Sequence, residues 1–252
     1  MPDVLLSAER FLRGVRFRLT RRLRDRQPAD VWPGLESIVI RQRPFAARFG
    51  SLSPHELALV CAVARLTRAK AVFEFGTYDG MTAWHLAANA APQGRVFTLD
   101  LPPDHPARSA DGHDRSVGDI RGVVVGSEYA GTDEGGRITQ LFGDSLEFDA
   151  APYRQTMDLI LVDAGHGGEH VRADTASALE MVRPGGVIFW HDYSRWWPGV
   201  QECLDRLART RPVFRVAGTA LAALVVPEQR AVRHAARGEL TKVRRTPIEG
   251  VN

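Results

Sequence analysis

Short apolar runs alternate with amphipathic stretches through the middle of the chain. Runs of strand length lie at residues 71–75, 95–99, 138–142, 157–162 and 187–190. Stretches with helical patterns lie at 54–66, 81–90, 168–182 and 199–209. Strands that alternate with helices need crossover connections, so the pattern predicts a mostly parallel sheet with helices on both faces.

The last pair of apolar runs breaks this alternation. Residues 213–216 and 220–226 flank the dipeptide Gly218-Thr219, which is typical of an antiparallel hairpin that closes the sheet. Residues 101–136, rich in Pro, Asp and Gly, form the longest irregular stretch. A segment of that length is usually a lid or a binding insertion.

The N-terminal part of the chain has a different character. From Leu5 to Leu19, apolar residues recur at steps of three and four with arginines between them, which predicts an amphipathic helix. We expect this helix to pack on its own domain or to form a homo-oligomer, with binding to a membrane surface as the alternative. The predicted organisation is an N-terminal helix and linker over 1–50, one α/β domain over 51–226, and a polar tail over 227–252.

Composition and charge narrow the class of protein. Hydrophobic residues make up 44% of the 252 residues, the usual globular share, which excludes a disordered chain. No apolar run approaches the length of about 20 residues that spans a bilayer, so we expect no transmembrane segment and a soluble, cytoplasmic protein. The net charge is +3. Residues 1–26 and 228–252 are basic, whereas the part of the chain between them is mildly acidic. Nucleic acid is therefore not an expected partner, because phosphate contacts need a clustered basic face.

Polar residues and glycines stand at the ends of the first three strands. The first strand runs through Gly76 and Gly80 into a helix, with GxxxG spacing in place of the GxGxxG of NAD enzymes. Asp100 ends the second strand, where an acid can accept both hydroxyls of a ribose. Asp144 and Ser145 follow the third strand, where a carboxylate can accept an adenine amino group; the alternative for this pair is a helix N-cap.

Two further motifs complete a family pattern, VDAGH at 162–166 and RPGGVIFWHDY at 183–193. From about residue 71 to 226 the chain resembles class I S-adenosylmethionine-dependent methyltransferases, in particular a family that includes metal-dependent O-methyltransferases of sugars and catechols. The resemblance implies a Rossmann-like, seven-stranded sheet. It also implies a cofactor site made of Glu74, Gly76, Thr77, Tyr78, Gly80, Asp100, Asp144, Ser145 and Asp163.

The same resemblance implies a divalent metal held after the fourth and fifth strands, at Asp163, His191 and Asp192. Neighbouring parallel strands lie about 4.8 Å apart, so side chains at their ends can converge on one ion. Oxygen ligands favour Mg²⁺, whereas a ligating His191 would favour a transition metal. His166 would overhang the same crevice as the catalytic base. For each histidine the alternative is a simple hydrogen bond to a loop carbonyl.

The sequence therefore predicts an S-adenosylmethionine-dependent O-methyltransferase that acts on a hydroxyl of a small molecule, a sugar, catechol or natural-product intermediate, with the help of Mg²⁺ or another divalent metal. One alternative is a metal-independent enzyme that uses His166 alone. The other is a non-catalytic module that binds S-adenosylmethionine and serves as a partner. A nicotinamide oxidoreductase is disfavoured because both GxGxxG and a Tyr-xxx-Lys pair are missing.

Overall fold

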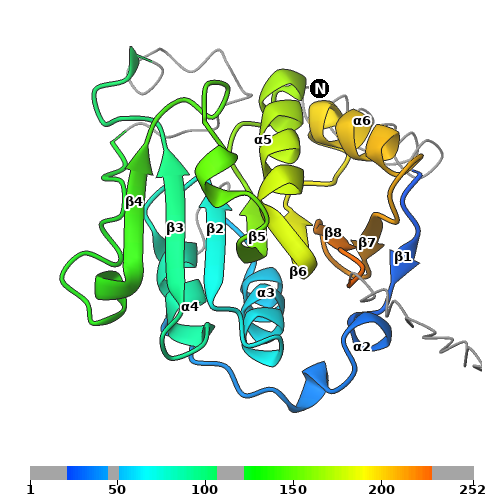
Figure 1. Ribbon diagram of the computed structural model, residues 1–252, viewed down its shortest axis with the longest axis horizontal. Coiled ribbons are helices and arrows are strands. Elements are labelled where there is room, and N and C mark those ends of the chain that lie inside the picture. The colour runs from blue at the N-terminus through cyan, green and yellow to red at the C-terminus, as the bar shows by residue number, and fades with distance from the viewer. Residues whose placement is uncertain (1–21, 45–50, 107–121, 229–252) are drawn as a thin grey trace, which may run out of the picture.

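The computed structural model describes residues 22–44, 51–106 and 122–228. Within these residues one sheet runs through the molecule (Figure 1). Its strands are β1 (Asp25–Arg26), β2 (Ala71–Phe75), β3 (Arg95–Asp100), β4 (Ile138–Phe142), β5 (Met157–Val162), β6 (Val182–Trp190), β7 (Phe214–Val216) and β8 (Ala222–Val225). Their order is β1-β7-β8-β6-β5-β2-β3-β4. Only β8 runs antiparallel to its neighbours, β6 and β7, among these strands.

Helices cover both faces of this sheet. The elements are α2 (Pro28–Val31), η1 (Leu35–Ser37), α3 (Pro54–Leu66), α4 (Met81–Asn89), η3 (Glu134–Arg137), η4 (Ala151–Tyr153), α5 (Gly168–Met181) and α6 (Pro198–Leu207). α3 packs beside α4, and α5 packs beside α6 (Figure 1). This pairing matches the crossover connections that parallel strands require.

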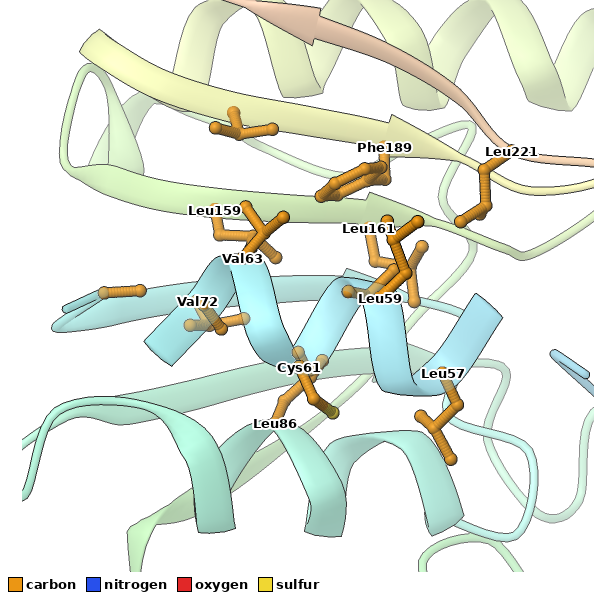
Figure 2. Close-up of a cluster of buried hydrophobic side chains, with 14 of the residues drawn as sticks. Leu57, Leu59, Cys61, Val63, Val72, Leu86, Leu159, Leu161, Phe189 and Leu221 are labelled. Atoms are coloured by element: carbon orange, nitrogen blue, oxygen red, sulfur yellow. The ribbon is translucent and has the colours of Figure 1, made fainter. Parts of the chain in front are cut away.

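Each face of the sheet has its own apolar core. Side chains alternate along a strand, so Val72 packs in the cluster under α3 and α4, whereas Phe73 packs in the cluster under α5 and α6. Figure 2 shows the first cluster, in which Val63 of α3 lies near Leu159 of β5 and Leu59 of α3 lies near Leu161. All of these side chains are buried.

The predicted N-terminus of α3 is confirmed by a capping box. The Ser53 hydroxyl oxygen accepts a hydrogen bond from the Glu56 backbone N–H (3.3 Å), and Glu56 Oε2 accepts one from the Ser53 N–H (3.0 Å). Pro54 occupies the first turn, where its missing N–H has no helical partner to lose. The capping box also fixes the position of the Glu56 carboxylate, which matters for the site below.

The Rossmann-like sheet, its closing hairpin and the helices on both faces are confirmed. β6 begins at Val182, five residues earlier than predicted, because Val182 pairs with Met157 before an irregularity in the register. The sheet has eight strands within the described residues, where the sequence predicts seven. The additional strand is β1, whose two polar residues have no apolar pattern and pair with β7.

Several predictions concern residues outside the described part of the chain. They are the amphipathic helix from Leu5 to Leu19, residues 107–121 of the irregular segment, and nearly all of the polar tail. The domain boundaries therefore stay predictions. Within the described ranges, residues 22–44 contact the α/β domain: β1 joins the sheet, and the backbone of Arg41 makes two 2.7 Å hydrogen bonds with the side chain of Asn89. Among the described helices, none has the length and apolar character needed to cross a bilayer.

Candidate active site

The turn between β2 and α4 lies in direct contact with the end of β5. Gly76 has a φ of +94°, and a Cβ built on it would stand 2.2 Å from the carbonyl oxygen of Asp163. Only glycine adopts this conformation cheaply and leaves room for the neighbouring backbone. The glycine turn and the residues after β5 therefore lie side by side at the carboxyl ends of the strands, where open parallel sheets bind ligands.

Asp100 ties the glycine turn to the end of β3. Its Oδ2 accepts a hydrogen bond from the Tyr78 backbone N–H (2.7 Å), and its Oδ1 accepts one from the Leu101 N–H (2.7 Å). Tyr78 has a positive φ of +53°, an uncommon conformation for a residue with a side chain. The carboxylate thus lies at the strand end where the sequence predicts it, and it helps to hold the strained turn.

Glu74 is buried in β2, two residues before Gly76. Its Oε2 accepts a 2.6 Å hydrogen bond from the Thr98 hydroxyl, and the Thr98 hydroxyl oxygen lies 2.7 Å from that of Thr77. Burial raises the pKa of Glu74 well above its usual range, the Thr98 bond opposes this effect, and the carboxylates of Asp163 and Asp100 add to it. The protonated form of Glu74 is thus favoured more than that of an exposed glutamate.

Asp144 and Ser145 follow β4 at the same edge of the sheet. Asp144 Oδ1 accepts a hydrogen bond from the Leu146 N–H (2.9 Å), which closes a turn. No helix begins here; the next helical element is η4. The helix N-cap alternative for this pair is thus wrong, and its carboxylate and hydroxyl stand at a strand end next to that of Asp100.

Acids and imidazoles form a cluster after β5 and β6. His191 Nδ1 lies 2.9 Å from Asp163 Oδ1 and 3.6 Å from Asp192 Oδ2. His191 Nε2 lies 3.5 Å from Oε2 of Glu56, which comes from α3. The sequence predicts Glu56 only as a capping residue, and it contains no signal for this contact. Both predicted strand ends do converge, as the parallel pairing of β5 and β6 requires.

His191 is surrounded by three carboxyl groups within the described residues. Burial opposes a charge on His191, but the carboxylates of Asp163, Glu56 and Asp192 together raise its pKa well above the usual range. Burial raises the pKa of Asp163, and His191 counteracts it. Burial also acts to raise the pKa of Glu56, but hydrogen bonding, with His191 first, lowers it to about 2. His191 therefore serves as the counter-ion of the carboxylates.

His166 is held by an acid on one side and an indole on the other. Its Nε2 lies 2.5 Å from Oδ2 of Asp192, a residue with a φ of +62°. Its ring stacks on Trp197 with a centroid distance of 3.9 Å and an interplanar angle of 16°. Its Nδ1 is buried and has no hydrogen-bond partner among the residues that the structure describes. Within the described ranges, neither His166 nor His191 forms the simple hydrogen bond to a loop carbonyl that was the alternative for each histidine. Both contact carboxylates instead.

The donor chemistry of this cluster fits a divalent cation. One ligand atom each from Asp163, His191 and Asp192 lies within 4.8 Å of the others. The two carboxylates offer the oxygen ligands that Mg²⁺ takes, and they are partly exposed. His191 could join them only by giving up its hydrogen bond to Asp163, because metal binding needs an unprotonated ring nitrogen.

The fold and the arrangement of acids and glycines at these strand ends define a class I, Rossmann-like methyltransferase. A family model described as a methyltransferase domain matches residues 73–193. A catechol O-methyltransferase of Mycobacterium tuberculosis is 31% identical over 172 residues, which are 64% of this chain and 70% of that protein. The chain belongs to the S-adenosylmethionine-dependent O-methyltransferase family.

Other known proteins agree with this assignment. A putative O-methyltransferase of Mycolicibacterium vanbaalenii is 28% identical over 152 residues, 60% of this chain and 59% of that relative's length. Among solved structures, the O-methyltransferase TomG of Streptomyces achromogenes, in complex with SAM, has a TM-score of 0.53 at 17% identity, and the alignment covers 84% of this chain and 95% of that one. The SAH-bound methyltransferase PaMTH1 of Podospora anserina has a TM-score of 0.53 at 14% identity, with coverages of 88% and 96%. At these identities the structures support the fold alone.

Proposed function

We propose that the protein transfers the methyl group of S-adenosylmethionine to a hydroxyl group of a small molecule. The observation that carries this proposal is the contact between Gly76 and Asp163. It brings a turn suited to the cofactor against a cluster of acids and imidazoles suited to activation of a hydroxyl. Alignment of two reactants is the largest contribution that such a site makes to methyl transfer.

The cofactor in this proposal lies across the ends of β2, β3 and β4. Its methionine end contacts Glu74, Asp163 and the turn that includes Thr77 and Tyr78 between Gly76 and Gly80. Its ribose hydroxyls donate to Asp100. Its adenine amino group lies beside Asp144 and Ser145. The support for this order is the order of the strands themselves, since β2, β3 and β4 are consecutive in the sheet.

Asp163 and Asp192, with His191 as the third donor, are the residues proposed to hold a divalent metal. Such an ion lowers the pKa of a bound hydroxyl. The chain's own residues supply the rest of the site's chemistry. His191 forms a hydrogen bond with the Asp163 carboxylate, which it would give up to act as a ligand, and Glu56 borders the far side of the His191 ring. The buried position of this cluster limits access of water that competes with the acceptor.

His166 is proposed as the proton acceptor, at Nδ1. Because Nε2 donates to Asp192, the neutral ring presents an unprotonated Nδ1, and Trp197 keeps the plane of the ring fixed. The acceptor oxygen loses its proton to Nδ1 and forms a bond to the methyl carbon as the carbon–sulfur bond breaks. S-adenosylhomocysteine then leaves as a neutral thioether, and His166 returns its proton to solvent.

We infer a catechol, a sugar or a natural-product intermediate as the acceptor. The support is the similarity to a catechol O-methyltransferase and the aromatic side chains after Asp192. Trp197 covers His166, and Trp196 is 43% exposed nearby in the chain, so a flat or sugar-like acceptor would find an indole surface.

The test is a methyl-transfer assay with catechols and hydroxylated sugars as acceptors, with Mg²⁺ and with EDTA. Methyl transfer to oxygen supports the proposal, and loss of transfer in EDTA supports the metal. Full activity in EDTA would favour the metal-independent route through His166. This route is the second candidate because each of the two carboxylates, Asp163 and Asp192, already has an imidazole partner. Binding of S-adenosylmethionine without transfer to any acceptor would favour a non-catalytic module.

A further inference from the structure

The side chain of Tyr129, between β3 and β4, covers the glycine turn. A Cβ built on Gly80 would stand 2.5 Å from Cδ1 of the Tyr129 ring, so the ring packs directly on the backbone of the turn. Two backbone bonds attach the same segment: Gly126 N–H donates to Tyr78 O (3.3 Å), and Glu128 N–H donates to Asp79 O (2.9 Å). Residues 126–129 therefore run along the turn that we assign to the cofactor.

The hydroxyl of Tyr129 ends a chain of hydrogen bonds that begins at the buried carboxyl group of Glu74. It donates to Gln140 Oε1 (2.5 Å), and Gln140 Nε2 donates to the Thr77 hydroxyl oxygen (3.0 Å). From Thr77 the chain continues through Thr98 to Glu74. Every member of this chain after Tyr129 lies on β2, β3, β4 or the glycine turn.

Electrostatics places the same hydroxyl near two carboxyl groups of the proposed cofactor site. Burial raises the pKa of Tyr129 to about 12, and the carboxylates of Glu74 and Asp100 add to the effect. The phenol is therefore neutral over the physiological range. Glu74 and Asp100 are the residues proposed to bind the methionine and ribose parts of the cofactor, so Tyr129 lies near both of these parts.

The segment that carries Tyr129 is clamped from outside by Arg43. Arg43 Nη2 donates to the backbone oxygen of Glu128 (2.6 Å) and to its Oε2 (2.7 Å). The guanidinium lies 4.4 Å from the ring centroid of Trp84 in α4, and the Arg43 N–H donates to His85 Nε2 (3.3 Å). Arg43 thus connects the segment before α3 to α4 and to the residue that precedes Tyr129.

We propose that Tyr129 is a cofactor-binding residue that forms a wall of the pocket between Gly80 and Asp100, and that Arg43 is a positioning residue that holds it there through Glu128. The inference rests on the proposed function, because it concerns the pocket for S-adenosylmethionine. A wall that is already ordered costs less conformational entropy when the ligand binds. Residues outside the strand-end motifs would then set part of the cofactor affinity.

The experiment measures binding of S-adenosylhomocysteine to the full chain by calorimetry. Tyr129→Phe keeps the ring and loses the bond to Gln140, so we expect binding about 3- to 10-fold weaker. Tyr129→Ala also loses the ring, and we expect a loss of at least about 30-fold. Arg43→Gln should weaken binding by about 3- to 10-fold, mainly through faster dissociation measured by stopped flow.

Two matched variants serve as controls. Tyr153→Phe alters a tyrosine that packs with Phe73 and Phe97 in the core on the other face of the sheet. Arg154→Gln alters an exposed arginine that pairs with Glu180. Both should bind within about twofold of the wild type. Thermal unfolding of the ligand-free proteins separates a loss of fold from a loss of affinity.

Each outcome decides between the claims. If the wild type binds, Asp100→Ala binds weakly and Tyr129→Ala binds like the wild type, the inference about Tyr129 is overturned and the proposed function stands. A wild type that does not bind S-adenosylhomocysteine overturns both. Should Tyr129→Ala not fold, Tyr129→Phe and Arg43→Gln decide the matter. In a protein that already carries Tyr129→Ala, Arg43→Gln should not weaken binding any further. If it weakens binding there as much as it does in the wild type, the positioning role of Arg43 is overturned.

Discussion

The backbones of Gly76 and Asp163 approach so closely that a Cβ on Gly76 would stand 2.2 Å from the Asp163 carbonyl oxygen. The two residues directly follow the adjacent parallel strands β2 and β5, and the Asp163 N–H also donates to the carbonyl oxygen of Phe75 (2.9 Å). The proposed cofactor turn and the proposed catalytic cluster are therefore parts of one rigid edge of the sheet.

Replacement of Gly76 tests this contact. Gly76→Ala combines an unfavourable positive φ with a backbone clash, so we expect a loss of about 2–4 kcal/mol in the free energy of unfolding and no detectable binding of S-adenosylhomocysteine. Gly218→Ala is the matched control, since Gly218 has a φ of +80° and nothing within 4 Å of a built Cβ. Urea denaturation compares the two variants. An equal loss in both would contradict a specific role for the Gly76–Asp163 contact.

Asp100 should determine a large part of the cofactor affinity. Asp100→Ala removes the acceptor for the ribose hydroxyls and for the Tyr78 N–H, so we expect binding of S-adenosylhomocysteine about 10-fold to 100-fold weaker by calorimetry. Asp149→Asn is the control, because Asp149 also accepts a backbone N–H, that of Ala151 (3.0 Å), but lies before η4. Unchanged affinity in Asp100→Ala would remove the assignment of the ribose site.

The carboxylates after β5 and β6 should bind a divalent metal. Asp163→Asn and Asp192→Asn should each weaken Mn²⁺ binding, measured by electron paramagnetic resonance, by about 10-fold or more. Glu180→Gln, at an exposed ion pair, should leave the metal affinity unchanged. If Mn²⁺ does not bind the wild type at millimolar concentration, the metal proposal is withdrawn and the His166 route remains.

His166 should matter for turnover and not for cofactor binding. We expect His166→Ala to lower kcat by about 10² to 10⁴, because the acceptor hydroxyl loses its proton acceptor, while the affinity for S-adenosylhomocysteine stays within about threefold. His55→Ala, at an exposed position of α3, is the matched control and should retain full kcat. Full turnover in His166→Ala would contradict the assignment of His166 as the base.

Asp174 should make stability depend on pH. Burial raises the pKa of this α5 carboxyl from 3.8 to about 7, which the nearby Ser145 hydroxyl only partly offsets, and neither oxygen makes a well-formed hydrogen bond to a described residue. The folded state therefore holds a proton that the unfolded state releases. The proton on Asp174 makes its full contribution to the free energy of unfolding below pH 4, and this contribution is lost as the pH rises toward 7.

The measurement compares Asp174→Asn with the wild type by urea denaturation from pH 5 to pH 8. The neutral amide removes the ionisation, so the stability of the variant relative to the wild type should rise by about 2–3 kcal/mol over this range and then level off. A difference that is constant with pH would show that Asp174 has an ordinary pKa in the folded protein.

Local signals in the sequence were sufficient for the regular elements. The strands β2 and β5 begin and end as predicted, since buried parallel strands are mostly apolar along their length, and the predicted bounds of the partly exposed edge strand β4 also hold. The bounds of α3 follow from its capping box and leading Pro54. β1 could not be predicted, because two polar residues form a strand only when the edge of β7 is already present to pair with them.

The sequence by itself determined the α/β class, the order of the main elements and the residues that end β2 to β6, because apolar periodicity and turn residues act over short distances along the chain. Only the tertiary structure decided that Glu56 reaches His191, that Asp192 binds His166 and that Tyr129 covers Gly80. These contacts join residues from different elements, and they depend on strand order, register and loop path. No local pattern carries that information, since it arises only when the whole sheet is assembled.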